Sequence, residues 1–473
     1  MSLNKSTIQI FLLLLFFIGS GHPILASQGM GDNPCKPNIV LIITDQQTAQ
    51  AMSNAGNKDL STPAMDGLAA RGTRFTQAYC PQPLCGPSRS SMLTGQLPHQ
   101  LNASINLPEK AGYWDKDIQI LGRIFKEGGY NTGYIGKWHL PVPVGEKDFH
   151  GFDFITNTIE RDWHDASIPA DCNDFLKQQA KQQGDKPFLM VASFINPHDI
   201  CEWARDYPLR MELLNEPPTP DQCPEIPYNY EIPAGEPTIL RQLQKLSWNT
   251  YPTIDWDKER WRQYRWAYYR LIEKVDLHIG RVLHALEKNK LADNTIIVFL
   301  SDHGDGAGSH RWNQKQVLYQ ESVNVPLIVS DPWNTGAKVN NKQLVNLGLD
   351  LIPTLCDYAG IQVPSYLIGE SFKKYVVDAD NFNADKITVL ETEFSQGPNS
   401  YDIKGRTLIT GSLKYIVYSK GDKREQLFDL ESDPGEMNDL TLDKSFDGEV
   451  KTMRSHLKDW CQAYQDDFVS FID

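Results

Sequence analysis

Two features of the 473-residue sequence predict an α/β fold, with a large, mostly parallel sheet that is sandwiched by helices. First, apolar runs rich in β-branched residues alternate with amphipathic segments, as expected for strands that are connected by helices. The predicted buried strands span residues 38–45, 186–198, 294–304 and 325–331. Second, ionisable side chains fall at the ends of these strands, namely Asp45, His198, Asp302 and His303. Because ligands of parallel sheets gather at the carboxyl ends of the strands, we expect a functional site there.

Helix signals occupy the connecting segments. Thr62 and Pro63 open one amphipathic segment as a cap and a first-turn residue, and a Gly-Gly pair that starts at Gly128 closes another. A longer helical pattern runs from about residue 257 to residue 289. We interpret its aromatic residues over 266–270 as a face that packs on the sheet.

The pattern changes from about residue 375. Residues 406–430 are predicted to form antiparallel strands joined by a Lys-Gly-Asp-Lys turn, and a final helix is predicted near 445–465. We therefore expect a large α/β domain over residues 27–374 and a smaller α+β subdomain over residues 375–473 that packs on it.

Residues 1–26 have the features of a secretory signal peptide, because Lys5 precedes an apolar stretch and small residues follow near Ala26. The apolar stretch is too short for a membrane anchor, and no later run approaches spanning length. We therefore expect an exported protein, secreted or periplasmic, without membrane insertion. The formal net charge of −14 argues against nucleic acid as a partner. An anionic substrate would need a few focused basic groups.

The spacings of the eight cysteines match no zinc pattern and no small disulfide scaffold, although export would permit disulfides. Cys85 stands out because Gly-Pro-Ser-Arg follows it. Pro87 suits the first position of a helix, so Cys85 would lie at the positive end of that helix beside Arg89. This placement predicts a nucleophile or a ligand for an anionic group.

Three further clusters carry ionisable or oxygen-bearing groups. Asp45 and Gln46 are either strand-end caps or oxygen ligands for a hard cation such as Ca²⁺. Lys137 and His139 are two residues apart and would lie on the same side of an extended segment, as surface residues or as catalysts. A glycine-rich loop after the third predicted strand holds Asp302, His303, His310 and Lys315.

The run "CGPSRSSMLTG" at 85–95 resembles the signature of the sulfatase family, which is Cys-x-Pro-Ser-Arg followed by Thr-Gly. The run "GYNTGYIGKWH" at 129–139 is similar to that family's second signature. "NIVLIITDQQ", "INPH", the "SDHG" loop and "EQLFDLESDPGEMNDL" also fall in the family's order, so the resemblance spans roughly residues 37–440. It implies an alkaline-phosphatase-like fold, with residues 27–374 as the catalytic domain.

The resemblance also implies a modified nucleophile. In this family the motif cysteine, here Cys85, is oxidised after translation to Cα-formylglycine (3-oxoalanine). The implied partner in biosynthesis is a formylglycine-generating or radical sulfatase-maturating enzyme. The aldehyde hydrates to a geminal diol, of which one hydroxyl attacks sulfur and the other expels sulfate, so that covalent catalysis includes its own release step.

The remaining roles follow from the same resemblance. The implied ligands of one Ca²⁺ are Asp45, Gln46, the modified Cys85, Asp302 and His303. Lys137 and Lys315 would neutralise the sulfate oxygens, and His198 is the candidate acid for the departing alcohol. Arg89 and His139 would contact the diol, with His139 as the base.

Two positions depart from the common family pattern. Gln46 stands where many sulfatases have a second aspartate, which removes one negative charge from the metal site. His303 would put a nitrogen on a hard cation, which is unusual for calcium.

We therefore expect a sulfuric ester hydrolase that removes O-sulfate from sulfated carbohydrates, such as glycosaminoglycan or other polysaccharide fragments. A uronate-2-O-sulfatase is one specific candidate. The first alternative is a phosphatase or phosphonate monoester hydrolase of the same superfamily, since the site suits any tetrahedral oxyanion. The second alternative is a non-catalytic binding protein, if Cys85 stays unmodified.

Overall fold

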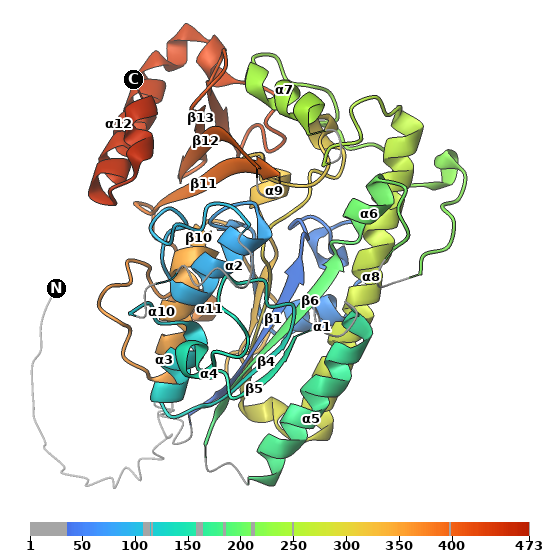
Figure 1. Ribbon diagram of the computed structural model, residues 1–473, viewed down its shortest axis with the longest axis vertical. Coiled ribbons are helices and arrows are strands. Elements are labelled where there is room, and N and C mark those ends of the chain that lie inside the picture. The colour runs from blue at the N-terminus through green and yellow to red at the C-terminus, as the bar shows by residue number, and fades with distance from the viewer. Residues whose placement is uncertain are drawn as a thin grey trace, which may run out of the picture. The chain divides into compact units, whose positions relative to one another are not determined.

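An eight-stranded, mostly parallel sheet forms the centre of the structure, a computed structural model (Figure 1). The strand order is β5-β4-β6-β1-β7-β8-β2-β9, and only β8 runs antiparallel to its neighbours. The strands are β1 (Asn38–Asp45), β2 (Thr73–Phe75), β4 (Asn131–Gly136), β5 (Phe154–Asn157), β6 (Phe188–Pro197), β7 (Thr295–Ser301), β8 (Leu327–Ser330) and β9 (Lys338–Asn340). The predicted fold class is confirmed, and all four predicted buried strands are present.

The structure describes residues 36–106, 114, 117–157, 164–182, 186–209, 213–247, 250–396 and 399–472. The predicted signal peptide and Cys35 lie outside these residues. The seven described cysteines are all free. Within the described ranges, no helix combines the length and the apolar character that crossing a membrane requires.

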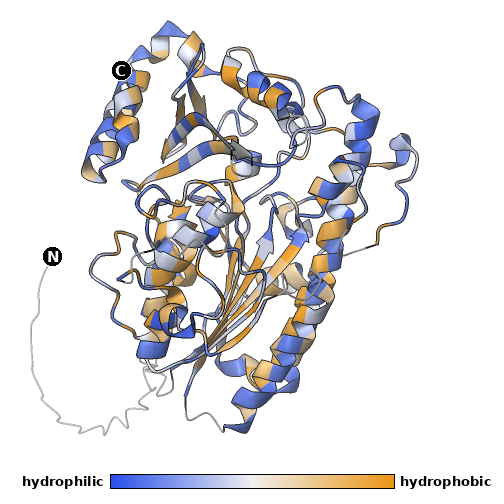
Figure 2. Ribbon diagram, in the orientation of Figure 1, coloured by the Kyte–Doolittle hydropathy of each residue, from blue (hydrophilic) through white to orange (hydrophobic). Residues whose placement is uncertain are grey.

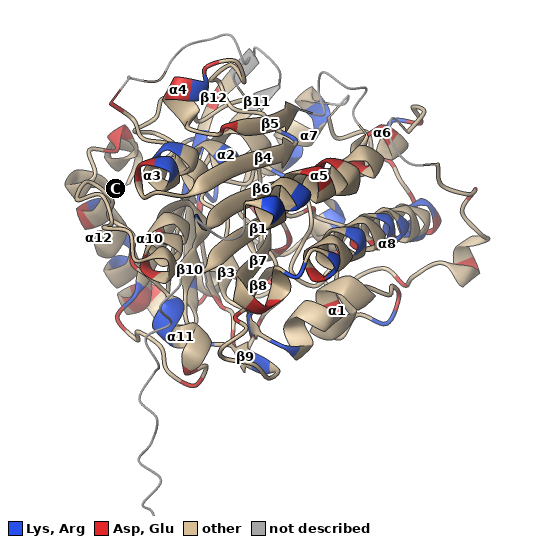
Figure 3. Cartoon of the chain, turned by 90° about the horizontal axis from the view of Figure 1, so that it is seen from below, with Lys and Arg blue, Asp and Glu red and all other residues tan. Residues whose placement is uncertain are grey.

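Helices cover both faces of the sheet because the side chains of a strand alternate between its two faces. In β1, Leu41 and Ile43 pack in one core with α2 (Cys85–Thr94), α3 (Leu121–Glu127) and α10 (Leu347–Ala359). Val40 and Ile42 pack in the other core with α1 (Pro63–Ala70), α5 (Ile168–Lys181) and α8 (Lys258–Lys288). Figure 3 shows these two helical layers on opposite sides of the sheet. Figure 2 shows the central strands as largely apolar, whereas α8 carries both apolar and hydrophilic residues.

The predicted helix ends are mostly confirmed. Thr62 does precede α1, but its hydroxyl does not cap the helix; instead Asp276 of α8 accepts the backbone N–H groups of Ala64 and Met65 at 3.0 and 2.9 Å. Gly128 directly follows α3, as predicted. Shorter helices are α4 (Lys147–His150), α6 (Ile200–Ala204), α7 (Thr238–Leu246), α9 (Gln320–Val323) and α11 (Lys373–Val377).

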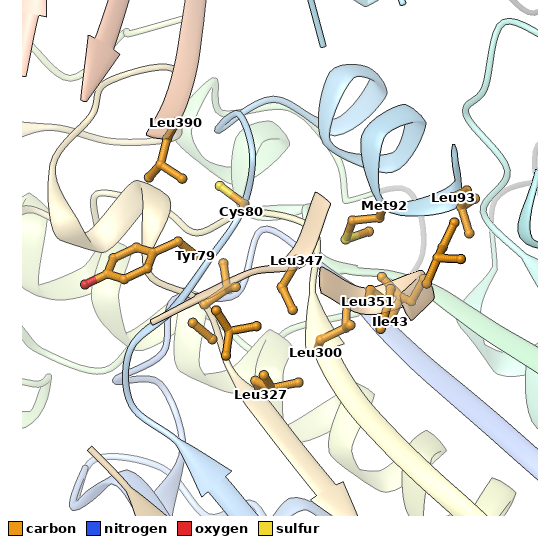
Figure 4. Close-up of a cluster of buried hydrophobic side chains, with 14 of the residues drawn as sticks. Ile43, Tyr79, Cys80, Met92, Leu93, Leu300, Leu327, Leu347, Leu351 and Leu390 are labelled. Atoms are coloured by element: carbon orange, nitrogen blue, oxygen red, sulfur yellow. The ribbon is translucent and has the colours of Figure 1, made fainter. Parts of the chain in front are cut away.

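Helix α2 packs against the central strands, and every one of its residues is buried. Its Met92 and Leu93 share a core with Ile43 of β1 and Leu300 of β7, and Leu351 of α10 completes this cluster (Figure 4). The helix begins at Cys85 and not at Pro87, which corrects the predicted start. Pro87 is tolerated at the third position because the first N–H groups of a helix have no intrahelical partner.

The C-terminal part forms a four-stranded antiparallel sheet in the order β11-β12-β13-β14. Its elements are β11 (Ile387–Gln396), β12 (Asn399–Thr410), β13 (Leu413–Tyr418), β14 (Glu425–Asp429) and the helix α12 (Asp447–Ala463). The predicted antiparallel strands and final helix are therefore confirmed. Two short strands, β3 (Ala78–Tyr79) and β10 (Val345–Asn346), pair separately. The domain boundary at 374/375 falls within α11 and stays a proposal.

An ion-pair network connects this C-terminal sheet to the segment that follows α2. Glu391 of β11 lies 2.7 Å from Nδ1 of His99 and 3.4 Å from Nη2 of Arg406. Arg406 in turn pairs with Asp466, 2.6 Å from its Nε. The sheet therefore braces the chain directly beyond the helix that carries Cys85.

Gly136 ends β4 at a position where only glycine fits. Its φ is 109°, and an added Cβ would lie 1.9 Å from the carbonyl oxygen of Ser193, whereas at Gly129, with φ of 88°, an added Cβ would meet no heavy atom within 4 Å. We predict that Gly129→Ala costs only the backbone term of about 1–2 kcal/mol, and that Gly136→Ala costs clearly more. Denaturant unfolding of both variants measures the difference. Equal losses would contradict the close approach of β4 to β6.

Candidate active site

The ten predicted site residues meet at the carboxyl end of the sheet. Neighbouring strands in the order β4-β6-β1-β7 are parallel, so their ends open on the same edge. Asp45 is the last residue of β1, and Gln46 follows it. Cys85 and Arg89 lie on α2. The other site residues lie beyond strand ends: Lys137 and His139 after β4, His198 after β6, Asp302 and His303 after β7, and Lys315 in the loop that follows them.

Cys85 is the first residue of α2 and is 1% exposed. Its Sγ lies 3.0 Å from Nζ of Lys315, 3.1 Å from Nε2 of His303 and 3.6 Å from Oδ1 of Asp45. Burial raises the pKa of the Cys85 thiol, but Lys137 and Lys315 outweigh burial and hold that pKa well below its ordinary value. The position at the head of α2 therefore favours an anionic group.

Four buried residues bring potential metal-ligand atoms to within 4.8 Å of one another: Asp45, Cys85, Asp302 and His303. Nδ1 of His303 lies 2.9 Å from the carbonyl oxygen of Gly304, which can only accept, so Nδ1 carries the proton. In the neutral ring the lone pair is on Nε2, which is the atom that would bind a cation and lies 3.7 Å from a carboxylate oxygen of both Asp45 and Asp302. These residues fit a divalent cation.

Arg89, one turn into α2, is fully buried and bonds to groups from several strand ends. Its Nε donates to Asp302 at 2.7 Å, and its Nη2 donates to Asp45 at 3.3 Å. Its Nη1 donates to the hydroxyl of Ser193 at 2.7 Å and to the carbonyl oxygen of Lys137 at 3.1 Å. Arg89 therefore fixes both carboxylates; its expected contact with the reacting group stays a prediction.

Lys137 and His139 both reach the site, but not by the predicted geometry. β4 ends at Gly136 and His139 has a φ of 53°, so the segment is not extended there and strand alternation does not apply. Nζ of Lys137 donates to Oδ2 of Asp45. His139 lies beside Cys85 and helps to lower the pKa of its thiol, and Nδ1 of His139 is buried without a partner among the described residues.

The charges around Asp45 keep it ionised. Burial alone would raise the pKa of this carboxyl group, but Lys137, His198 and Arg89 hold the pKa below its ordinary value. A neighbouring opposite charge also sets the pKa of Lys315. Burial alone would lower this pKa, but Cys85 outweighs burial and the pKa is raised.

His198 is only partly buried and lies near Cys85, Lys137 and Lys315. Burial lowers the pKa of His198 to about 4, and the charges of Lys315 and Lys137 act in the same direction. The end of β6 is anchored by the buried carboxylate of Asp165, which accepts the backbone N–H groups of the residues at 195 and 196 at 2.7 and 2.8 Å.

Three residues that the sequence did not assign to the site also reach it. The hydroxyl of Tyr268 donates to the carbonyl oxygen of Gln46 at 2.7 Å, although its stretch was interpreted as packing only. Asp305 accepts from Gln46 and from the hydroxyl of Tyr264. The i, i+4 spacing of the two tyrosines is the one signal that could have found them. His310 instead stacks on Tyr319, with ring centroids 3.9 Å apart.

Comparison with known families shows which family the chain belongs to. The model of the family described as Sulfatase matches residues 37–361, which is more than half of the chain. The chain belongs to the sulfatase family. A second model, described as N-sulphoglucosamine sulphohydrolase, C-terminal, matches residues 308–463 of this sulfatase. The protein is a sulfuric ester hydrolase, as the sequence predicted.

Known sulfatases resemble this one over nearly their whole length. A Delta 4,5-hexuronate-2-O-sulfatase of Bacteroides thetaiotaomicron is 29% identical over 451 residues, which cover 92% of this chain and 91% of that protein. An N-acetylglucosamine-6-O-sulfatase of the same organism is 26% identical and covers 98% of this chain and 92% of that protein.

Solved structures are also similar to this chain over nearly its whole length. A 2-O GAG sulfatase superposes with a TM-score of 0.79 and 27% identity over 92% of this chain and 94% of that one. A phosphonate monoester hydrolase of Agrobacterium radiobacter superposes with a TM-score of 0.69 at 20% identity over 91% of this chain and 96% of that one, which shows a shared fold alone.

Removing one charge from the carboxylate cluster should weaken metal binding. We predict that Asp302→Asn lowers the affinity of the purified protein for Ca²⁺ at least about tenfold, because a hard anionic ligand is lost. Calorimetric titration with calcium measures this affinity. Asp276→Asn is the matched control, since Asp276 is 1% exposed and lies outside the cluster. Unchanged affinity in Asp302→Asn would remove this residue from the metal site.

Proposed function

We propose that the protein removes O-sulfate from sulfated carbohydrates, with position 85 as the nucleophile in its formylglycine form and with a bound calcium ion. The observation that carries this proposal is the placement of Cys85 at the head of a fully buried helix, where its Sγ contacts Nζ of Lys315. There Cys85 is also one of the four residues whose ligand atoms lie close enough together to bind a metal ion. An ordinary structural cysteine does not require two lysines, an arginine and three histidines around it.

The charge balance of the site supports an anionic substrate. Formylglycine is neutral, so in the modified protein two carboxylates, Asp45 and Asp302, would face the cations of Arg89, Lys137 and Lys315. The cations exceed the carboxylates by one before any metal binds. Lys137 and Lys315 are the groups that would hold the sulfate oxygens, since each lies beside the nucleophile or its neighbour Asp45.

Two groups outside the unmodified chain complete the chemistry. Calcium, held by Asp45, Gln46, Asp302, His303 and position 85, would act as a Lewis acid toward the nucleophile and a sulfate oxygen. Formylglycine, when hydrated, supplies two hydroxyl groups on one carbon, one as nucleophile and one for release of sulfate.

Two histidines are placed to move protons. His139 lies beside position 85 and would accept a proton there as the base. His198, which is partly exposed, would protonate the leaving oxygen of the sugar. The pKa of His198 is about 4 partly because Lys315 and Lys137 repel a proton, so a sulfate group that neutralises these lysines would raise the pKa and favour the acid form.

A uronate-2-O-sulfate is the first substrate to test, because the hexuronate-2-O-sulfatase and the 2-O GAG sulfatase are both similar along almost the whole chain. We further propose export to the periplasm or outside the cell after loss of residues 1–26, and oxidation of Cys85 by a formylglycine-generating or radical sulfatase-maturating enzyme. The catalytic domain would be residues 27–374 and the C-terminal subdomain residues 375–473.

A panel of defined substrates tests the proposed function. Sulfate release is measured from an unsaturated uronate-2-O-sulfate disaccharide, N-acetylglucosamine-6-sulfate, an algal sulfated oligosaccharide and a matched phosphate monoester. We expect sulfate from a sugar ester and no more than traces of phosphate. Efficient phosphate release without sulfate release would favour the phosphatase alternative, and no turnover by fully modified protein would favour a binding protein.

The state of position 85 is directly measurable. In a host with a maturation enzyme, we predict that mass spectrometry of the peptide around Cys85 finds formylglycine. Cys85→Ser keeps one hydroxyl but lacks the second, so we expect at most a single slow turnover. An unmodified thiol in fully active protein, or sustained turnover by the serine variant, would rule out the proposed chemistry.

His198 can be tested through the leaving group. A sugar alkoxide is strongly basic and needs a proton, whereas a nitrophenolate does not, and general acid catalysis contributes about 10²–10⁴-fold. We predict that His198→Ala lowers kcat/KM for a sugar sulfate by roughly that factor and for an aryl sulfate much less. Equal losses on both substrates would assign His198 to binding the sulfate group instead.

A further inference from the structure

Asp305 is a fully buried carboxylate in the loop after β7. It accepts hydrogen bonds from Nε2 of Gln46 at 2.8 Å, the hydroxyl of Tyr264 at 2.9 Å, and the backbone N–H groups of Ala307 and Gln314 at 2.7 and 3.1 Å. Each of these neighbours is a donor.

The side chain of Gln46 has two chemically different ends. Both oxygens of Asp305 accept a backbone N–H group, so they act as acceptors here, and the NH₂ end of the amide faces Asp305. The oxygen at the other end accepts from Nζ of Lys315 at 2.9 Å, and the same Nζ lies 3.0 Å from Sγ of Cys85. The direction of the amide is therefore set by an acceptor on one side and a cation on the other.

The backbone of Gln46 is held separately from its side chain. Its φ is 74°, its carbonyl oxygen accepts from the hydroxyl of Tyr268 at 2.7 Å, and its N–H donates to Asp302 at 3.2 Å. With the main chain fixed, a half-turn about the last side-chain bond would exchange the oxygen and the nitrogen at almost the same positions. Only hydrogen-bond chemistry opposes that exchange.

We infer that Asp305 is a positioning residue that keeps the side-chain oxygen of Gln46 turned toward Lys315 and the nucleophile. An amide oxygen binds a hard cation and an amide nitrogen does not, so this orientation is also what a calcium ligand at position 46 requires. That last step rests on the proposed function. The orientation of the amide itself does not.

Exchanging the chemistry of the two partners tests this inference. Asp305→Asn is nearly isosteric, but its new NH₂ group must face either the N–H of Ala307 or the donors of Gln46 and Gln314, so a donor always opposes another donor. Gln46→Glu alone sets two carboxylates against each other. In the double variant, the new amide at 305 can donate to the new carboxylate at 46, whose second oxygen still faces Lys315. The pair of substitutions leaves the net charge unchanged.

Two readouts are used, melting temperature in excess chelator and calorimetric affinity for Ca²⁺. In chelator we expect both single variants to melt below the wild type and the double variant to melt above both single variants. For calcium we expect Asp305→Asn to bind about 10–100-fold more weakly, and the double variant to recover this loss. A purely structural role for Asp305 does not predict such mutual rescue.

Asp276→Asn is the matched control, because Asp276 is also a buried carboxylate that accepts two backbone N–H groups. It should lower the melting temperature and leave calcium affinity unchanged. Additive losses in the double variant, or full calcium affinity in Asp305→Asn, would overturn the inference. If the wild type binds no calcium, the metal part of the proposed function fails, and the melting series alone decides the role of Asp305.

Discussion

The guanidinium group of Arg89 connects the elements from which the site is built. It is fully buried and pairs with both Asp45 and Asp302, so it joins α2 to the ends of β1 and β7. Cys85 lies one turn earlier on the same helix and is placed by the same contact. Removing one partner of a buried ion pair typically costs about 3–5 kcal/mol because an uncompensated charge remains. The placement of Cys85 and the packing at the carboxyl end of the sheet therefore depend on one side chain.

The other charged groups of the site are also buried and paired, as Arg89 is. Burial disfavours the ionised forms of Asp45 and Lys315, and an opposite charge beside each of them outweighs burial. Lys137 against Asp45 and Lys315 against Cys85 are two such cases. A site arranged in this way cannot change one charged residue without altering the protonation of its neighbours, which is why single substitutions here are expected to affect several steps at once.

The central strands could be predicted from the sequence because strands that are buried on both faces are continuous apolar runs, as β1 and β7 show. The site could be predicted because parallel strands bring their carboxyl ends together and because the cysteine motif is specific. The start of α2 could not be predicted, since the first turn of a helix needs no internal N–H hydrogen bonds and Pro87 is compatible with more than one position in it.

The hydrogen bonds that support the site could not be predicted from the sequence either. The tyrosines of α8 suit an apolar helical face whether or not their hydroxyl groups bind the site, so Tyr264 and Tyr268 carry no signal beyond their spacing. Asp305 lies in a loop rich in charged groups, and loop conformation decides which of them face inward.

The complete burial of α2 also bears on the order of events during biosynthesis. Under the proposed modification, an enzyme would have to reach the Cys85 side chain, and the finished fold leaves that side chain 1% exposed at the head of a packed helix. Oxidation and folding would then compete for the same nascent chain. A preparation from a host in which folding is faster would contain a stable protein that no later treatment with the oxidising enzyme could activate. Its specific activity would then report the fraction of chains that were oxidised before they folded, while its melting curve would not distinguish oxidised from unoxidised protein.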